Sequence, residues 1–189
     1  MTPGKTLVFF DEIQECPADA GVALPCYNVT EPRAPLRLNE QSNLFRLYMG
    51  DTGLLCASME NVQFGILGGD LTVNMGSILE NSFAQLLKAN GFELRYMNRK
   101  SLGEIDFVLQ QGKTIVPVEV KSGGDYESHS ALNNVLRVSD WGILKAYVFC
   151  GGNVSVRGQI TYLPWYMVMF FKQERLPEHL IVDVDLKSL

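Results

Sequence analysis

The sequence predicts an α/β fold, a three-layer arrangement in which a mixed central sheet is flanked by helices. Two observations carry this prediction. Residues 77–90 have apolar residues at helical spacing, and three strand-like runs follow them. A second helical segment and a further apolar strand come next, so the order is helix, three strands, helix, strand. An order of this kind is typical of a sheet covered by helices.

The first helix is predicted over Ser77–Asn90. Four apolar residues recur there at helical spacing, namely Leu79, Phe83, Leu86 and Leu87. The pair Asn90-Gly91 is a typical stop signal for a helix. The expected helix therefore has one apolar face and ends at a glycine.

Three strands are predicted next, over Phe92–Met97, Glu104–Leu109 and Thr114–Lys121. The turn at 110–113 joins the last two strands as a hairpin. A second helix is expected over Glu127–Val138 and a strand over Lys145–Cys150, which Gly151-Gly152 closes. A strand near Gln159–Leu163 and a helix beginning at Pro164 complete this part.

The segments on either side are less regular. Four prolines make Cys16–Arg37 an expected irregular connection, and several glycines make Glu60–Asn74 an expected loop. Asp51-Thr52 is expected to cap a short helix. A short buried strand is expected over Thr6–Phe10, and Val182, Val184 and Leu186 alternate with aspartates near the end of the chain.

Composition limits the classes of function. The chain has 189 residues, a hydrophobic fraction of 47%, a charged fraction of 20% and a net charge of −5. A folded domain is expected, and a broad basic surface for nucleic acid is not. The four cysteines are not spaced as a zinc or redox motif, which fits a reducing cytoplasm. No apolar stretch approaches the roughly 20 residues of a membrane span, so no membrane association is expected.

Three charged side chains of the second and third strands form a candidate metal site. Side chains alternate along a strand, so Glu119 and Lys121 share a face. The hairpin can bring Asp106, which is expected on the same face as Glu104, close to Glu119. Two adjacent carboxylates repel each other unless a cation lies between them, and oxygen ligands suit Mg²⁺ or Mn²⁺. A neighbouring lysine could orient water or stabilise a phosphate, as phosphodiester hydrolysis requires.

Glu80 is a fourth candidate. In a helix it shares a face with Phe83, Ala84 and Leu87, where an unpaired carboxylate is costly. A metal or Lys121 is the expected partner. Other interpretations remain open: Glu80 lies in a first helical turn that favours a carboxylate, and Asp106 could cap a turn or pair with Arg99.

Most of Ala18–Phe171 resembles the C-terminal domain of a family of bacterial and archaeal AAA-type ATPases, a domain similar to PD-(D/E)xK (restriction-endonuclease-like) nucleases. The resemblance rests on the segments Tyr27–Pro32, Phe45–Tyr48, Asp51–Leu55, Gly76–Asn81, Tyr96, Glu104–Phe107, Val118–Gly123 and Ile160–Tyr166. It implies a PD-(D/E)xK core with catalytic residues Glu80, Asp106, Glu119 and Lys121. The first three would bind the metal. Ile105 departs from the pattern, because nucleases often have proline there.

Leu7–Glu12 resembles the Walker B strand of the same ATPase family, with Asp11 and Glu12 as its nucleotide-site carboxylates. Gly4-Lys5-Thr6 is not expected to form a P-loop, because no strand and no glycine-rich loop precede it. The Walker B segment is therefore interpreted as vestigial, and ATP binding is not expected. The chain resembles an internally deleted or truncated family member.

The expected organisation has four parts. Residues 1–17 are the Walker B remnant, 18–75 the connection and beginning of the C-terminal domain, 76–171 the nuclease-like core with its terminal helix, and 172–189 a tail. Two functions stay open. One is metal-dependent hydrolysis or binding of nucleic acid. The other is a non-catalytic module that binds a protein partner, a second copy of the chain or nucleic acid.

Overall fold

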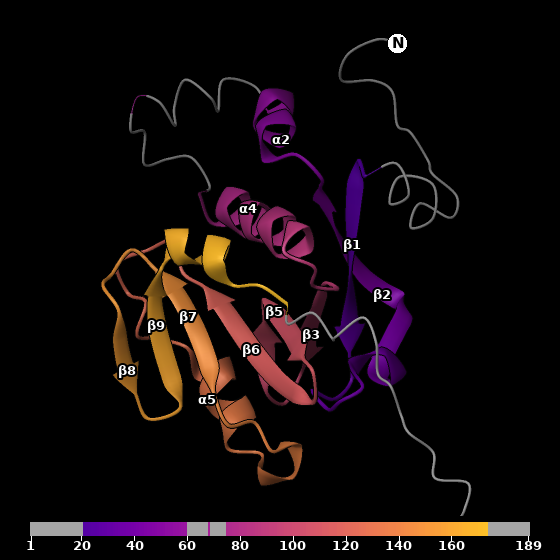
Figure 1. Ribbon diagram of the computed structural model, residues 1–189, viewed down its shortest axis with the longest axis vertical. Helices are drawn as coiled ribbons and strands as arrows, with labels where there is room; N and C mark the ends of the chain where they lie inside the picture. The colour runs from indigo at the N-terminus through magenta and orange to yellow at the C-terminus, as the bar shows by residue number, and fades with distance from the viewer. Residues whose placement is uncertain (1–20, 60–67, 69–74, 174–189) are drawn as a thin grey trace, which may run out of the picture.

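The computed structural model describes residues 21–59, 68 and 75–173, and the structural statements below concern these residues. They form two sheets with helices on both sides, as Figure 1 shows. The α/β class with mixed sheets and flanking helices is confirmed. The expected strand over Thr6–Phe10, the Walker B pair Asp11 and Glu12, and the alternation at 182–186 lie outside the described residues, as does the expected loop at 60–74 except for Gly68.

Two sheets replace the predicted central sheet. One has the order β2-β1-β3-β4 and the other β5-β6-β7-β9-β8. The elements in chain order are β1 (Ala23–Val29), η1 (Leu36–Asn39), β2 (Glu40–Met49), α2 (Thr52–Ser58), α4 (Met75–Ala89), β3 (Arg95–Arg99), β4 (Gly103–Ile105), β5 (Phe107–Gln111), β6 (Thr114–Val120), α5 (Ser130–Leu136), η2 (Ser139–Trp141), β7 (Ala146–Cys150), β8 (Ser155–Arg157), β9 (Ile160–Pro164) and η3 (Trp165–Phe170). Within the described part, no helix is long and apolar enough to cross a membrane.

The predicted stop at the end of the first helix is confirmed. Gly91 has a φ of 92°, a left-handed conformation that favours glycine. The amide of Gly91 donates to the carbonyl of Lys88, and that of Phe92 donates to the carbonyl of Leu87, both at 3.0 Å. These two bonds form a Schellman motif, and the buried side chains of Phe92 and Leu87 pack in the same cluster. Helix α4 therefore ends where its last carbonyls are satisfied.

The predicted strand Glu104–Leu109 is interrupted at Asp106. Strand β4 pairs with β3, whereas β5 pairs with β6, so the chain passes from one sheet to the other at this residue. Ile105 and Phe107, on either side of the bend, lie in different hydrophobic clusters. The expectation that Asp106 lies within a continuous strand is therefore wrong.

Both faces of the larger sheet are buried. Phe107 and Leu109 of β5 pack in the cluster that contains Phe83 and Leu87 of α4. Val108, between them, packs in the cluster that contains Leu132 and Val135 of α5. Successive residues of a strand point to opposite faces, so α4 and α5 cover opposite sides of this sheet, and the layers are helix, sheet, helix (Figure 1). The parallel pairing of β6 with β7 follows from the α5 crossover between them.

Strand β1 corrects the expectation of an irregular connection over Cys16–Arg37. Pro25 pairs with Leu47 of β2, whereas β3 pairs only with Tyr27 and Asn28 further along β1. A proline without an amide hydrogen is tolerated there, because no strand of the described residues lies beside Pro25 on that edge of β1. The conformation of Ala23–Val29 is therefore that of a strand with buried apolar residues, even though it contains a proline.

Two further boundaries differ from expectation. Helix α5 is shorter than predicted, and the residues after Pro164 form the 3₁₀ helix η3, whereas an α-helix was expected there.

The predicted cap of α2 is confirmed, since the Asp51 carboxylate accepts from the amide of Leu54 at 2.8 Å. An N-terminal carboxylate of this kind satisfies an amide that has no partner within its helix.

Gly103 is a position where any side chain is expected to be costly. Its φ is 102°, and a Cβ there would lie 2.8 Å from the Cβ of Ala131. We expect Gly103→Ala to destabilise the fold by about 2–3 kcal/mol, since it combines backbone strain with a clash against α5. Gly123→Ala is the control, because a Cβ at Gly123 meets no atom within 4 Å. Equal midpoints of the two variants in urea unfolding would contradict this expectation.

Candidate functional site

The four predicted site residues come from three elements and meet at the end of β6. Glu80 lies on α4, Asp106 at the bend between β4 and β5, Glu119 in β6, and Lys121 directly after β6. The Asp106 carboxyl interacts electrostatically with the other three side chains. Because the chain passes from one sheet to the other at Asp106, the Asp106 carboxylate lies beside the end of β6. The structure therefore brings the predicted set into one neighbourhood.

Asp106 has a strongly perturbed acidity. Burial and the nearby Glu119 carboxylate raise its pKa from 3.8 to about 7. The amide of Val120 donates to Asp106 Oδ2 at 2.8 Å, which favours the charged form and opposes the rise. The sequence left two other roles open for Asp106, as a turn cap or as a partner of Arg99. In the structure its carboxylate accepts from the Val120 amide of β6 instead. The pKa of Asp106 therefore lies much closer to neutral pH than that of an ordinary aspartate.

Glu119 and Lys121 form an ion pair at the end of β6, an interior strand of the larger sheet. Glu119 is only 5% exposed, and the Lys121 Nζ lies 3.4 Å from its Oε2. Burial raises the pKa of Glu119 against the opposing effect of Lys121. Backbone bonds fix the lysine, since its amide donates to the Phe149 carbonyl at 2.8 Å and its carbonyl accepts from Trp165 Nε1 at 2.9 Å. The ammonium group therefore extends from a rigid backbone position.

The partner of Glu80 differs from the prediction. Arg46 of β2 donates to Glu80 Oε1 at 3.1 Å, and the Tyr48 hydroxyl donates to the same oxygen. Lys121, one of the two expected partners, is paired with Glu119 instead. Burial and the charge of Glu80 raise the pKa of Tyr48, which keeps its hydroxyl protonated and able to donate. A protein cation thus neutralises Glu80.

Arg46 is shared between two carboxylates. Its second guanidinium nitrogen is paired with Glu104, and the guanidinium lies over the Tyr96 ring, 4.3 Å from the centroid. Burial alone would lower the pKa of Arg46, but its hydrogen bond to Glu104 and the neighbouring Tyr48 raise it. Sequence reasoning did not single out Arg46 or Tyr48. Their spacing of two in a strand, which puts both on one face, was the available signal.

Asp106 and Glu119 fit a hydrated cation better than a site made wholly of protein ligands. One oxygen of each, Asp106 Oδ1 and Glu119 Oε1, makes no hydrogen bond or ion pair with the described residues. Mg²⁺ usually keeps several waters and takes one or two carboxylates, which such a pair can supply. Across the described ranges, no group of three or more His, Cys, Asp or Glu side chains is arranged to hold a metal ion. Glu80 is engaged with Arg46 and Tyr48, so a cation at Glu80, the third predicted metal ligand, would have to compete with these contacts.

One comparison with known proteins covers the part of the chain that carries the four predicted site residues. Residues 75–168 match the model of a domain of unknown function, DUF4143. A UPF0102 protein of Kosmotoga olearia is 40% identical over 55 residues, which are 29% of this chain and 48% of that protein. A UPF0102 protein of Aliarcobacter butzleri is 40% identical over 62 residues, which are 32% of this chain and 54% of that protein. The chain thus spans about half the length of these curated relatives.

No solved structure matches the chain. The part that matches the domain model contains Glu80, Asp106, Glu119 and Lys121, whereas Arg46 and Tyr48 lie before it. The two residues that donate hydrogen bonds to Glu80 therefore lie outside the matched part. Over residues 75–168, the chain is similar to the DUF4143 domain.

Proposed function

We propose that this chain is a nuclease-like domain of the AAA-type ATPase family and hydrolyses phosphodiester bonds of nucleic acid with Mg²⁺ or Mn²⁺. The observation that carries the proposal is the pair of coupled carboxylates, Asp106 and Glu119, beside Lys121 at the end of β6. Clusters of strongly perturbed titratable groups are typical of functional sites. The match to DUF4143, a domain associated with AAA-ATPase-containing proteins, supports the assignment to this family.

Each residue has a role in this proposal. Asp106 and Glu119 would hold the cation, which when bound polarises a phosphate oxygen and activates water. The Lys121 ammonium, held 3.4 Å from Glu119, stabilises negative charge that develops on the phosphate. Glu80 acts through its contacts with Arg46 and Tyr48, which place a positive charge at the edge of the site.

A cleavage assay tests this proposal. We expect the chain to cut single- or double-stranded DNA or RNA with Mg²⁺ or Mn²⁺, and Lys121→Ala to lower the rate by roughly 100-fold or more, because the phosphate loses its nearest cation. Lys113→Ala, at an exposed turn, is the matched control and should retain the rate. Calorimetric titration of Mn²⁺ should show weaker binding to Glu119→Gln. Failure to cleave any of these nucleic acids above a Glu119→Ala preparation, with either metal, would exclude the catalytic function.

The ion pair between Glu80 and Arg46 favours a second function. Arg46 already neutralises this carboxylate, and within the described residues no three-ligand metal group is present. These observations suit a non-catalytic module that binds a protein, a second copy of the chain or nucleic acid in the cytoplasm. Absence of Mn²⁺ binding at millimolar concentration, with specific association seen by light scattering, would favour this function over hydrolysis.

In both cases we propose that the chain does not use ATP. The sequence lacks a glycine-rich phosphate loop before a helix, which nucleotide binding of this kind requires. A nucleotide titration is expected to show no saturable binding, and a micromolar dissociation constant would contradict this expectation.

A further inference from the structure

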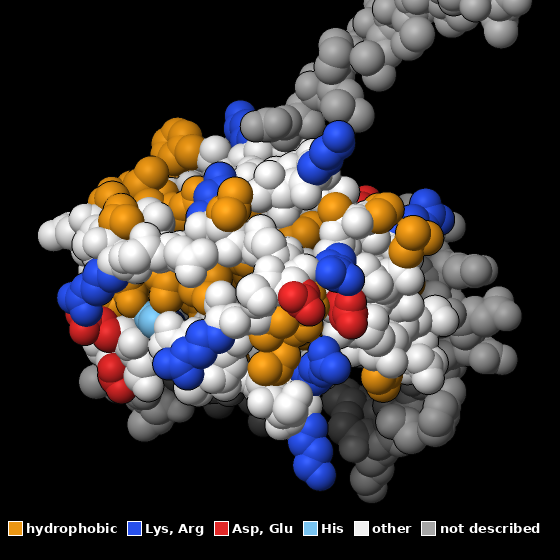
Figure 2. Space-filling view, turned by 90° about the horizontal axis from the view of Figure 1, so that it is seen from below, with side chains coloured by type: hydrophobic (Ala, Val, Ile, Leu, Met, Phe, Trp, Pro, Cys, Tyr) orange, Lys and Arg blue, Asp and Glu red, His pale blue; other side chains and the backbone are white. Residues whose placement is uncertain are grey.

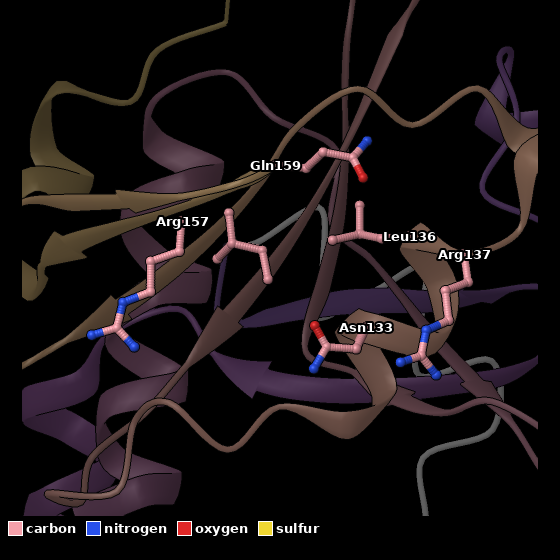
Figure 3. A pocket seen from close by; sticks show the side chains of 6 residues that line it. Asn133, Leu136, Arg137, Arg157 and Gln159 are labelled. Atoms are coloured by element: carbon pink, nitrogen blue, oxygen red, sulfur yellow. The ribbon is translucent and has the colours of Figure 1, made fainter.

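A polar hollow of about 340 Å³ lies between α5 and the β8–β9 turn. Its lining consists of Asn133, Leu136, Arg137, Arg157, Gln159 and Ile160. Figure 3 shows Arg157 and Arg137 on two sides of it, with Asn133 between them. Its size is at the lower end of the range for ligand pockets, roughly 300–1,000 Å³.

The hollow is separate from the carboxylate site. Ile160, which lines it, pairs with Ala146 at the beginning of β7. Glu119 instead pairs with Val148, further along β7, and Lys121 follows the end of β6. The hollow and the carboxylate site therefore lie toward opposite ends of the parallel strands. A ligand in the hollow does not need the metal.

Arg137 supplies a positive charge that none of the described residues neutralises. Its side chain is exposed and makes no hydrogen bond or ion pair with the described residues, and the same holds for the Asn133 amide. Seen from the end of the molecule near α5, Lys and Arg side chains are spread across the surface (Figure 2). Donors without partners in a hollow are available to an anion.

Arg157 is held in place from beneath. Its guanidinium lies over the Tyr162 ring, 5.7 Å from the centroid, and the Tyr162 hydroxyl is 2.6 Å from Nε2 of the buried His129. The carboxylate of Glu127 lies 2.6 Å from Arg157, and both side chains are more than half exposed. An exposed pair of this kind contributes little to stability, so an anionic ligand can replace Glu127 at small cost.

We infer that this hollow binds phosphate groups, with Arg137 and Arg157 as its charged ligands. Guanidinium groups donate two parallel hydrogen bonds to phosphate oxygens, so each arginine can hold a phosphate on its own side of the hollow (Figure 3). Leu136 and Ile160 supply an apolar surface beside the charged groups, which suits the sugar or base attached to a phosphate. The phosphate can come from the free ion or from a nucleic-acid backbone.

Titration in the presence of EDTA tests the inference without the metal site. Inorganic phosphate and a ten-residue oligothymidine are the two probes, followed by calorimetry and by fluorescence anisotropy, respectively. We expect Arg137→Gln and Arg157→Gln each to weaken binding roughly tenfold, as loss of a charge-assisted bond implies. With the oligonucleotide, the slope of log K against log salt concentration should fall by about 0.7 for each lost phosphate contact.

Arg37→Gln is the matched control, since Arg37 is exposed and lies outside the hollow. We expect it to change binding less than about twofold, and Glu127→Gln to tighten binding roughly threefold by freeing Arg157. Binding of phosphate alone, of oligothymidine alone or of both supports the site and identifies the source. The inference is overturned if neither probe binds, or if both hollow variants bind as the Arg37 variant does. Either result leaves the cleavage test unaffected, because that test depends on Lys121 and the metal.

Discussion

Asp106→Asn is expected to stabilise the folded chain by about 2 kcal/mol at pH 8 and to have little effect near pH 4. Burial and the Glu119 charge raise the pKa of Asp106 from 3.8 to about 7 in the folded state. The full difference would correspond to about 4 kcal/mol, which partial exposure of Asp106 reduces to about 2 kcal/mol. Asparagine carries no charge and keeps an oxygen that can accept from the Val120 amide.

The pH dependence has a definite sign. Between pH 4 and 7 the folded state binds more protons at Asp106 than the unfolded state does, so this group makes stability fall as pH rises. Below pH 4 both states are protonated, and above pH 7 both are ionised, so the contribution is constant outside this window. Denaturant unfolding of both proteins at several pH values measures the difference. An advantage of the variant that does not grow from pH 4 to pH 8 would contradict the assignment.

The same substitution is expected to weaken metal binding, because the cation would lose one of its two carboxylates. In the unmodified chain a proton and the cation compete for Asp106, so Mn²⁺ affinity should increase as pH rises through about 7. Stability and metal affinity would then change in opposite directions, as is common at functional sites. A Mn²⁺ affinity that is constant between pH 6 and 8 would exclude Asp106 as a ligand.

Arg46→Met is expected to destabilise the fold by about 1–2 kcal/mol, because its ion pairs are only partly buried and lie between the ranges for exposed and buried pairs. The substitution keeps an apolar chain over Tyr96 but removes the cation shared by Glu80 and Glu104. The two carboxylates would then face each other and the Tyr48 hydroxyl without a positive charge. Helix α4, which carries Glu80, would lose its ionic link to β2.

Urea unfolding at neutral pH measures this loss. The control is Arg33→Met, because Arg33 is 3.9 Å from Glu31 and both side chains are largely exposed. We expect its effect to remain within about 0.5 kcal/mol. Combining Arg46→Met with Glu80→Gln should restore part of the stability, since one uncompensated charge is removed. An Arg46 variant as stable as the Arg33 variant would show that the shared guanidinium does not support the fold.

The features that could be predicted from the amino-acid sequence are those that depend on local periodicity and chain geometry. The succession of helix, strands, helix and strand from α4 to β7, the end of α4 at Gly91 and the common face of Glu119 and Lys121 follow from residues within a few positions of one another, whereas β1 and the division between β4 and β5 do not. The α/β class follows from that order. Short-range spacing is sufficient here, because capping and side-chain alternation are properties of a single element.

Which charged groups neutralise one another could be seen only once distant segments of the chain had been placed side by side. Arg46 and Glu80 are 34 positions apart, and Asp106 receives its hydrogen bond from Val120, 14 positions away. The division into two sheets, with Asp106 at the bend, could not be predicted from the sequence either. Its cause is that Ile105 and Phe107 pack in different hydrophobic clusters. Burial raises the pKa of Asp106 only after these distant residues have packed around it. The partner of Glu80 and the raised pKa of Asp106 thus both depend on how distant segments pack together. No local pattern in the sequence contains this information.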